Sequence, residues 1–568
     1  MNIKELIEKL KREDLPKKFV LDIFGRKIKD DDVVAHADVI KNNSNLPEGF
    51  FLNLGYNEIS DIGVKALADA IKNNYKLPLD FHLSLWGNKI SDTGAKALAD
   101  AIKNNPYLPK GFILNLGNNQ ISCIGAAELA DAIKNNPYLP KGFNLNLSNN
   151  KINEDGAKAF ADAINNNLNL REGFNLNISY GEIKDEGAIA LADAIKNNFK
   201  LPKGFNLDIA GNHILGIGAM AIAEAIKNNS NLPEGFNLNV SYIEVNYEET
   251  KFLADAIKNN SNLPKDFGLN ISYSEIKDEG AKALADVMNN NLNLPEGFNL
   301  NLAQNKISYI GVTALADAIK NNHRLPISFN LNLRNNEILD DGVKALADAI
   351  KSNPKLPEGF NLNLAGNQIS DIGAKELADV IKNNPNLPKG FNLNLEYNQI
   401  SDIGATALAD AIKTNSKLSD GFYLSLEINQ ISDDGSKALA DAILSLKKPG
   451  LNKIIIQLYD LKVKQAVQEQ NEYIDRHYNQ VVTAIGRSYS LSKEGKVSKS
   501  SLTKLTYKPI AQILSYLLPS AYNIRGTFIF MGLKIDYFIE PNNTKTLNEI
   551  KDNYIIDLKN KSHNLRAS

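Results

Sequence analysis

One segment of this chain, residues 139 to 167, recurs with variations along most of the sequence. It reads LPKGFNLNLSNNKINEDGAKAFADAINNN, and its central leucine returns at fourteen positions that are each 31 residues apart, without an insertion. These anchor positions are Leu21, Leu52, Leu83, Leu114, Leu145, Leu176, Leu207, Leu238, Leu269, Leu300, Leu331, Leu362, Leu393 and Leu424. A fixed period of roughly 20 to 50 residues predicts a solenoid, in which each unit buries its apolar face only against its neighbours.

Each repeat unit begins with a strand pattern and ends with a helix pattern. From Phe143 to Leu147, apolar residues alternate with asparagines, which is typical of a strand with one buried face. Residues 156 to 164 have small and apolar residues at helical spacing, with Lys158 and Asp162 on the expected solvent side. Strands joined by helices should be parallel, with right-handed crossovers. Because parallel strands lie ~4.8 Å apart and packed helices ~8 to 10 Å apart, the array must curve with its strands inside.

The units share the pattern LxLxxNxI, followed by a glycine and a segment like ALADAI. One copy has Leu362, Leu364, Asn367, Ile369 and Gly373 at these places. The pattern resembles the leucine-rich repeat, specifically its ribonuclease-inhibitor-like class, over about three quarters of the chain. The resemblance implies an α/β solenoid of about 14 repeats, a curved horseshoe with a parallel β-sheet inside and helices outside.

Every one of the fourteen units has a phenylalanine two residues before its anchor, from Phe19 and Phe50 to Phe422. The family usually has a leucine three residues before the anchor instead. Since alternate strand residues share a face, each phenylalanine should point inward with its anchor. We therefore predict a phenylalanine spine in the core rather than a ligand site.

An asparagine follows most anchors by five residues, as at Asn57, Asn88, Asn119, Asn150 and Asn212. The family resemblance implies that its side-chain amide bonds buried main-chain groups where the strand turns. Four units lack it and have Arg26, Gly181, Ile243 or Ser274 instead. The eighth unit also has Glu249 in place of the repeat's glycine, so residues 179 to 280 should be the least regular part of the array.

A glycine stands near the start of most helix patterns, as at Gly156, Gly187 and Gly280. We expect it where a side chain would crowd the neighbouring coil. The first unit has Asp32 and His36 in place of the usual glycine and leucine, as a terminal repeat often does, and we expect His36 to be partly exposed.

Charge divides the chain into two regions. Residues 446 to 568 hold 19 Lys plus Arg against 10 Asp plus Glu, whereas residues 1 to 445 hold 45 against 56. Cys123 is the only cysteine and is expected in a repeat loop, so no disulfide framework exists and a reducing compartment fits best. The N-terminus has no signal-peptide form, and no apolar run is long enough to predict a membrane span.

We predict five regions along the chain. They are an N-terminal capping helix (1–20), the repeat array (21–452), a closing strand and long helix (453–486), a basic linker (487–508) and a small C-terminal α+β module (509–568). The linker could instead bind acidic lipid or nucleic acid, although no nucleic-acid motif supports this and nucleic acid is not expected as a partner. In the last region, a helix and two short strands around Gly532 are expected, with peripheral membrane contact as the alternative.

The residues beside the anchor leucines should line the concave face. In the middle of the array they are mostly asparagines, which can bond along a ladder and make a neutral, wet surface. The first units differ, because the same face there carries Val20, Phe24, Phe51, His82, Trp86 and Ile113, with Tyr56 just beyond. An exposed aromatic cluster is typical of a protein-binding site. We expect small neighbours such as Gly55 and Gly117 to leave the Trp86 ring standing out, the alternative being that it folds down onto the flanking strands.

Two further groups are candidates for secondary binding, with surface drift as the alternative. Tyr180, Tyr242 and Tyr273 recur just past the concave face, each followed two residues later by a glutamate (Glu182, Glu244 and Glu275). Near the far end, an acidic and aromatic group comprises Glu396, Tyr397, Tyr423, Glu427 and Ile428.

No pattern for catalysis is present. The six histidines, His36, His82, His213, His323, His477 and His563, stand singly without metal-ligand spacing. Neither a phosphate-binding loop nor a nucleophile elbow occurs. Some bacterial leucine-rich repeat effectors carry a ubiquitin ligase domain that acts through a cysteine, but no cysteine follows Cys123. The sequence predicts no cofactor and no enzymatic activity.

The leading hypothesis is a monomeric scaffold that binds a protein partner on the concave face. Resemblance supports it, since ribonuclease inhibitor and some receptors use this repeat for binding. The heavy use of Lys, Asn and Ile suggests an AT-rich microbe, so the chain could be a bacterial effector, cytoplasmic or secreted without a signal peptide into a host cytosol. The alternative is GTPase activation of the Ran type, although the acidic tail of that family is replaced here by a basic C-terminus.

Overall fold

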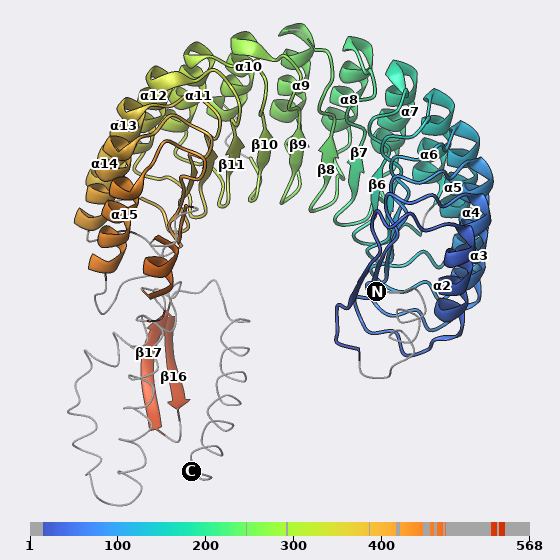
Figure 1. Cartoon of the computed structure of the whole chain (residues 1–568). Coiled ribbons are helices and arrows are strands. Elements are labelled where there is room, and N and C mark those ends of the chain that lie inside the picture. The colour runs from blue at the N-terminus through green and yellow to red at the C-terminus, as the bar shows by residue number, and fades with distance from the viewer. Residues whose placement is uncertain are drawn as a thin grey trace, which may run out of the picture. The chain divides into compact units, whose positions relative to one another are not determined.

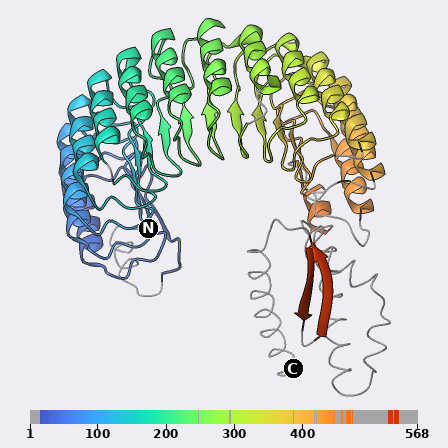
Figure 2. The ribbon, with the colours of Figure 1, turned by 180° about the vertical axis from the view of Figure 1, so that it is seen from behind.

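The computed structural model confirms the repeat array. It describes residues 15–167, 169–245, 247–290, 294–384, 387–415, 418, 421–446, 455–458, 463–469, 472, 524–530 and 533–539. Among the described residues up to Gln457, short strands alternate with helices, and these strands form one open, fifteen-stranded parallel sheet in chain order. Figure 1 shows the array as an arc with the sheet on its concave side and the helices on its convex side. The view from behind shows the same two layers (Figure 2).

Each strand of the array is three residues long. The strands are β1 (Val20–Asp22), β2 (Phe51–Asn53), β3 (His82–Ser84), β4 (Ile113–Asn115), β5 (Asn144–Asn146), β6 (Asn175–Asn177), β7 (Asn206–Asp208), β8 (Asn237–Asn239), β9 (Gly268–Asn270), β10 (Asn299–Asn301), β11 (Asn330–Asn332), β12 (Asn361–Asn363), β13 (Asn392–Asn394), β14 (Tyr423–Ser425) and β15 (Ile455–Gln457). From β1 to β14, every anchor leucine pairs with the next anchor, as Leu145 does with Leu176. The closing strand β15 puts Ile456 opposite Leu424, one residue later than the period requires.

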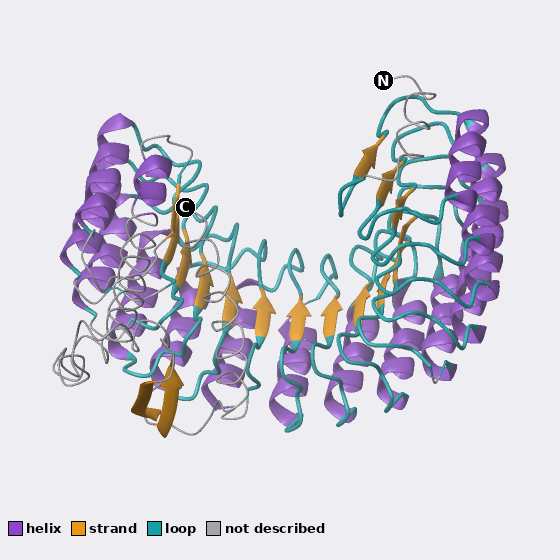
Figure 3. Cartoon of the chain, turned by 90° about the horizontal axis from the view of Figure 1, so that it is seen from below, coloured by secondary structure: helices purple, strands orange, loops and turns teal. Residues whose placement is uncertain are grey.

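The helices have 13 or 14 residues each. They are α2 (Asp30–Asn42), α3 (Asp61–Asn73), α4 (Asp92–Asn104), α5 (Cys123–Asn135), α6 (Glu154–Asn166), α7 (Lys184–Asn197), α8 (Gly216–Asn228), α9 (Tyr247–Asn259), α10 (Lys277–Asn290), α11 (Tyr309–Asn321), α12 (Leu339–Ser352), α13 (Asp371–Asn383), α14 (Asp402–Thr414) and α15 (Asp433–Ser445). Seen from below, they follow the outside of the sheet along the whole arc (Figure 3).

The predicted phenylalanine spine is present. The rings stack from Phe19 through Phe50 to Phe422, with neighbouring centroids 5.8 to 6.3 Å apart. From Phe50 onward the rings are buried, whereas Phe19 at the end of the stack is half-buried. Each unit therefore adds one ring to a continuous apolar column, which ties neighbouring units together.

The asparagines five residues after the anchor leucines form hydrogen bonds with the main chain, as predicted. The Nδ2 of Asn57 donates to the carbonyls of Ile23 and Leu54 at 3.0 Å, and its Oδ1 accepts from the amide of Ile28 at 3.0 Å. Where Gly181 and Ser274 replace the asparagine, their own amides donate to the asparagine Oδ1 of the next unit. Each such side chain satisfies main-chain groups in two units at once, which explains why the strand ends there.

The glycines near the helix starts are indeed crowded. A Cβ on Gly187 would lie 2.9 Å from the Cβ of Ala157 in α6, and one on Gly280 would lie 2.3 Å from Ile276 Cγ2. Most of these glycines also donate their amide to the first aspartate of the preceding helix. Asp61, for example, accepts from the amides of Ser91 and Gly94 at 2.8 and 3.0 Å. The helix starts of successive units are thus capped across the unit boundary.

Two single-residue expectations were wrong. Cys123 is not in a loop but is the first residue of α5, and it is half-buried. His36 is not partly exposed but fully buried, because it takes the place of the leucine that points from each helix into the core, as Leu67 does. The Nδ1 of His36 lies 2.7 Å from the carbonyl oxygen of Asp32, and its Nε2 has no partner among the described residues.

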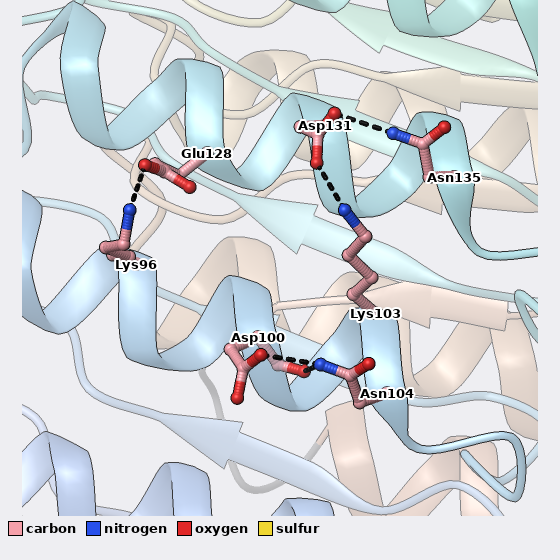
Figure 4. A network of polar contacts seen from close by, with 7 residues as sticks. All are labelled: Lys96, Asp100, Lys103, Asn104, Glu128, Asp131 and Asn135. Atoms are coloured by element: carbon pink, nitrogen blue, oxygen red, sulfur yellow. Dashed lines mark hydrogen bonds and ion pairs between the residues drawn. The ribbon is translucent and has the colours of Figure 1, made fainter.

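Ion pairs join the convex faces of neighbouring helices. Lys158 and Asp162 do not pair with each other; Asp162 accepts from Lys134 of the preceding unit at 2.7 Å. Figure 4 shows the equivalent contact between α4 and α5, Lys103 with Asp131 at 2.8 Å, and a second pair at other positions, Lys96 with Glu128 at 2.5 Å. All these side chains are substantially exposed, so the pairs contribute little to stability.

Beyond the array, the structure describes two antiparallel strands, β16 (Ile524–Phe530) and β17 (Leu533–Ile539), which lie on either side of Gly532 as expected. Of the predicted capping helix (1–20), residues 1–14 lie outside the described residues, and residues 15–20 contain a turn that leads into β1 rather than a helix. The linker in 487–508 and the other segments of the C-terminal module also lie outside the described residues. None of the helices that the structure describes is long and apolar enough to cross a membrane. Nor do the described residues contain a group of three or more potential metal ligands.

Candidate functional site

The N-terminal concave face carries one row of side chains just before the anchors. Val20, Phe51, His82 and Ile113 occupy paired positions in β1 to β4. The rings of Phe51 and His82 stack in parallel with their centroids 4.0 Å apart. Val20 is 51% exposed, and the other three are half-buried. Burial lowers the pKa of His82 from its ordinary value of 6.5, so the ring is neutral at pH 7 and extends the apolar surface.

A second row of aromatic rings runs along the edge where the strands end. Phe24 contacts Tyr56 edge-on with centroids 5.1 Å apart, and Tyr56 contacts Trp86 in the same way at 4.3 Å. Phe24 and Tyr56 are 45% and 48% exposed. The structure therefore brings together the residues that the sequence placed in one cluster. Three consecutive units thus supply one continuous aromatic strip. We call this strip and the row of Val20, Phe51, His82 and Ile113 the N-terminal aromatic face.

Of the two positions that the sequence left open for the Trp86 ring, the structure shows the one folded down onto a flanking strand. A Cβ on Gly117 would lie 2.6 Å from Trp86 Cδ1, so the indole lies down over that glycine. Phe24 covers Gly55 and Tyr56 covers Gly87 in the same manner. Small neighbours make room for a ring to lie flat rather than leaving it exposed. The alternative interpretation of Trp86, as a ring packed on the adjoining strand, therefore describes its position, and the half-buried ring still contributes to the strip.

The central concave face consists of two kinds of asparagine. Those just after the anchors close the turn, because the Oδ1 of Asn146 accepts from the amide of Ser148 at 2.8 Å and most other units repeat this bond. Both kinds line a polar hollow of about 300 Å³ that includes Asn299, Asn301 and Asn330 and ends at Tyr423. For the first kind, the Oδ1 thus bonds within its own unit, while the Nδ2 of Asn53 and of Asn177 donates to Asp22 and Asp208 of a neighbouring unit.

The tyrosines of the irregular units form a cluster. The rings of Tyr242 and Tyr273 stack with centroids 4.2 Å apart, and Tyr180 reaches Tyr242 across Gly211 with centroids 5.7 Å apart. Burial among these rings and hydrogen bonding with the Tyr273 and Tyr180 hydroxyls raise the pKa of Tyr242, so it stays un-ionised at every physiological pH. We call these three residues the central tyrosine cluster.

The far-end group is held by contacts within the chain. The Tyr423 hydroxyl donates to Gln457, and Glu396 accepts from Ser425 Oγ at 2.7 Å. Glu427 is buried, and Ile428 is 45% exposed. The guanidinium carbon of Arg334 lies 5.4 Å from the centre of the Tyr397 ring, within the range of a cation–π contact. Of the two candidates for secondary binding, the far-end group is therefore the one whose side chains are already engaged with other side chains of the same chain.

The comparisons with known proteins agree with this architecture. A family model for the leucine-rich repeat matches eight segments, residues 51–68, 82–99, 144–161, 175–192, 269–285, 330–347, 361–378 and 392–409. This chain is a leucine-rich repeat protein. The matched segments each run from a strand into the following helix, so the family pattern coincides with the structural unit.

Distant similarities to solved structures add no argument about partners. The chain is similar to the actin-binding site 2 of leiomodin-1, with 16% identity and a TM-score of 0.24, over 30% of this chain and 95% of that chain. It is similar to an internalin from Listeria monocytogenes, with 18% identity and a TM-score of 0.32, over 73% of this chain and 92% of that chain. A search of curated proteins gave no match.

Proposed function

We propose that this leucine-rich repeat protein binds a protein partner with its N-terminal aromatic face. The observation that carries the proposal is the contact chain from Phe24 through Tyr56 to Trp86, beside the stacked Phe51 and His82. Side chains of these types are the usual centres of binding energy in protein interfaces. Their support is rigid, because the strands below them are held by the phenylalanine spine and the asparagine bonds.

Several finer points are also our proposals. A helix of 13 or 14 residues in each described unit supports the ribonuclease-inhibitor-like class. The Lys-, Asn- and Ile-rich composition supports a microbial source, and we propose an effector that works in a host cytosol on a host protein. Ran-type GTPase activation remains the alternative, but no residue in the described part of the chain specifically favours it.

The experiment is a capture from a eukaryotic cell lysate with matched variants. The double variant Phe51→Asn/Trp86→Ser replaces both rings with residues that other units carry at the same positions, as at Asn144 and Ser148, so the fold should persist. The control variant Tyr397→Asn changes an aromatic residue at the far end of the array. We expect wild type and control to capture the same protein. Because the double variant loses residues at the centre of the proposed interface, its binding free energy should be weaker by about 2 kcal/mol or more.

Equal capture by all three proteins, with equal melting temperatures, would contradict the proposed face. A fall in melting temperature of the double variant without loss of capture would show that both rings are structural. Either result would turn attention to the central tyrosine cluster.

A further inference from the structure

A hollow of about 290 Å³ lies beside the central tyrosine cluster. The stacked rings of Tyr242 and Tyr273 form one wall, and Glu275, Lys306 and Glu337 contribute charged groups to its lining. The two rings are 40% and 42% exposed, which is high for side chains that already stack on each other. The hollow belongs to units eight to eleven, so it is separate from the N-terminal aromatic face.

Two carboxylates and one ammonium group line this hollow. The Glu275 carboxylate lies 2.5 Å from the Nζ of Lys306 and 3.9 Å from the Nζ of Lys277, which does not line the hollow. Glu337 has no ion-pair partner among the described residues. The carboxylate of Glu337 is therefore left unpaired in the lining. Because the face of an aromatic ring also carries negative charge density, the hollow favours a cation.

The array itself shows how such a cation is held. Tyr397 occupies the same position in its unit as Tyr242 and Tyr273 do in theirs, four residues after the anchor. Arg334, which comes from two units earlier, places its guanidinium 5.4 Å from the Tyr397 ring centre. An arginine thus already covers one tyrosine of this row.

The central tyrosine cluster lacks this internal arginine. The positions equivalent to Arg334, two units before Tyr242 and Tyr273, are occupied by Ser179 and Ala210. Both side chains are short and buried. Within the described part of the chain, no lysine or arginine lies over the Tyr242 or Tyr273 ring. Tyr180, from two units before Tyr242, contacts that ring edge-on. Two units before Tyr273 the chain has only Ala210 and Gly211. The Tyr273 ring is therefore presented without a cation and lines the hollow together with Glu337.

We propose that this hollow binds an arginine side chain of a partner polypeptide, with the guanidinium on the Tyr242–Tyr273 rings and paired with Glu337. Arginine fits better than lysine because its flat guanidinium can stack on a ring and bond a carboxylate with two N–H groups. The site would add a charge-selective contact to a partner held elsewhere on the array, and it stands whether or not the N-terminal aromatic face is the main interface.

The test uses the full chain and three acetylated, amidated peptides, Gly-Ser-Arg-Ser-Gly and the same sequence with citrulline or lysine in the centre. Citrulline has the shape of arginine without its charge. Binding is followed by NMR titration at about 25 mM salt, where exposed charges are least screened. We expect the arginine peptide to bind at least about fivefold tighter than the citrulline peptide. Its side-chain methylene protons should shift upfield, because they lie over an aromatic ring.

Three variants locate the contact. Tyr273→Asn and Glu337→Gln should each weaken binding of the arginine peptide about fivefold and leave the citrulline peptide unaffected. Asparagine is chosen because Tyr273 has a φ of +54° and the repeat itself uses asparagine there, as at Asn149 and Asn335 with φ of +54° and +52°. Tyr397→Asn is the control and should change nothing, since Arg334 covers that ring. Equal binding of arginine and citrulline peptides, a lysine peptide that binds best, or an unaffected Tyr273→Asn variant would each overturn the proposal.

Discussion

Replacing Gly187 with valine should loosen the contact between α6 and α7. A Cβ at this position would lie 2.9 Å from the Cβ atoms of both Ala157 and Ile183, and 3.4 Å from the Cα of Glu154. None of these atoms is the mobile end of a side chain, so the helices must move apart. Valine adds two further methyl groups to this clash.

The size of the effect follows from two opposing contributions. Overpacking of this kind costs about 1 to 3 kcal/mol, and more when several atoms clash. Removing a glycine from a helix returns less than about 1 kcal/mol, and less for valine than for alanine because valine is β-branched. We therefore expect a net loss of about 2 kcal/mol for Gly187→Val and a smaller one for Gly187→Ala.

The eighth unit shows how a side chain can be accommodated at the position of the helix-start glycine. Glu249 stands at the equivalent glycine position, and its Oε1 would lie 2.5 Å from a Cβ on Gly216 in the preceding helix. Gly216 has no side chain there, whereas α6 has Glu154 at its first position. The eighth unit accommodates its glutamate through a second change that Gly187→Val lacks.

The assay is thermal and urea unfolding followed by circular dichroism, with Glu186→Val as the control. Glu186 is exposed on the same helix, so its replacement tests valine without the clash. Because a solenoid couples only neighbouring units, Gly187→Val should lower the first midpoint and can split the transition in two. A single transition at the wild-type midpoint would refute the packing argument.

Three further predictions concern stability. His36→Leu restores the residue of the other units and removes a buried nitrogen without a partner, so it should stabilise the first unit by about 1 to 3 kcal/mol. Because burial lowers the pKa of His36 below 6.5, wild type should lose stability as the pH falls below that value, and the variant should lose less; equal pH profiles in thermal melts would contradict this. Asn212→Ala leaves the carbonyls of Ile178 and Ile209 and the amide of Gly181 unpaired. It should lower the free energy of unfolding in urea by at least about 2 kcal/mol. The control Asn149→Ala replaces an exposed asparagine and should cost only the backbone strain of alanine at that position. Lys103→Ala breaks only an exposed ion pair, so a measurable fall in its melting temperature would contradict the view that the convex pairs contribute little.

The period of the repeat determined most of the fold in advance. Since the anchor leucines are spaced without insertion, they had to face one another across the sheet, and they do from Leu21 to Leu424. The phenylalanine spine and the crowding at Gly187 followed from alternation and helix packing, which depend on position within the unit. These features repeat, so many copies supported each inference.

Single substitutions were harder to predict because their surroundings are set by another unit. His36 was expected at the surface, but its position in the helix decides its burial whatever the side chain. The sequence left open whether the Trp86 ring stands out or folds down, and the structure shows it over Gly117, 31 residues later. The signal was present in the sequence, since Phe24, Tyr56 and Tyr180 each precede a glycine by the same 31 residues. The buried asparagine after each helix was missed too, although it recurs in most units and Asn105, for example, donates to the carbonyl of Ile71 at 2.6 Å.

Hydrogen–deuterium exchange of the chain with and without the captured partner tests the N-terminal aromatic face most directly. We predict that bound partner slows exchange in β1 to β4 and in the residues next to Phe24, Tyr56 and Trp86, while β10 to β12 exchange as in the free chain. Slower exchange confined to β10 to β12, or to the convex helices, would contradict the N-terminal aromatic face as the binding surface.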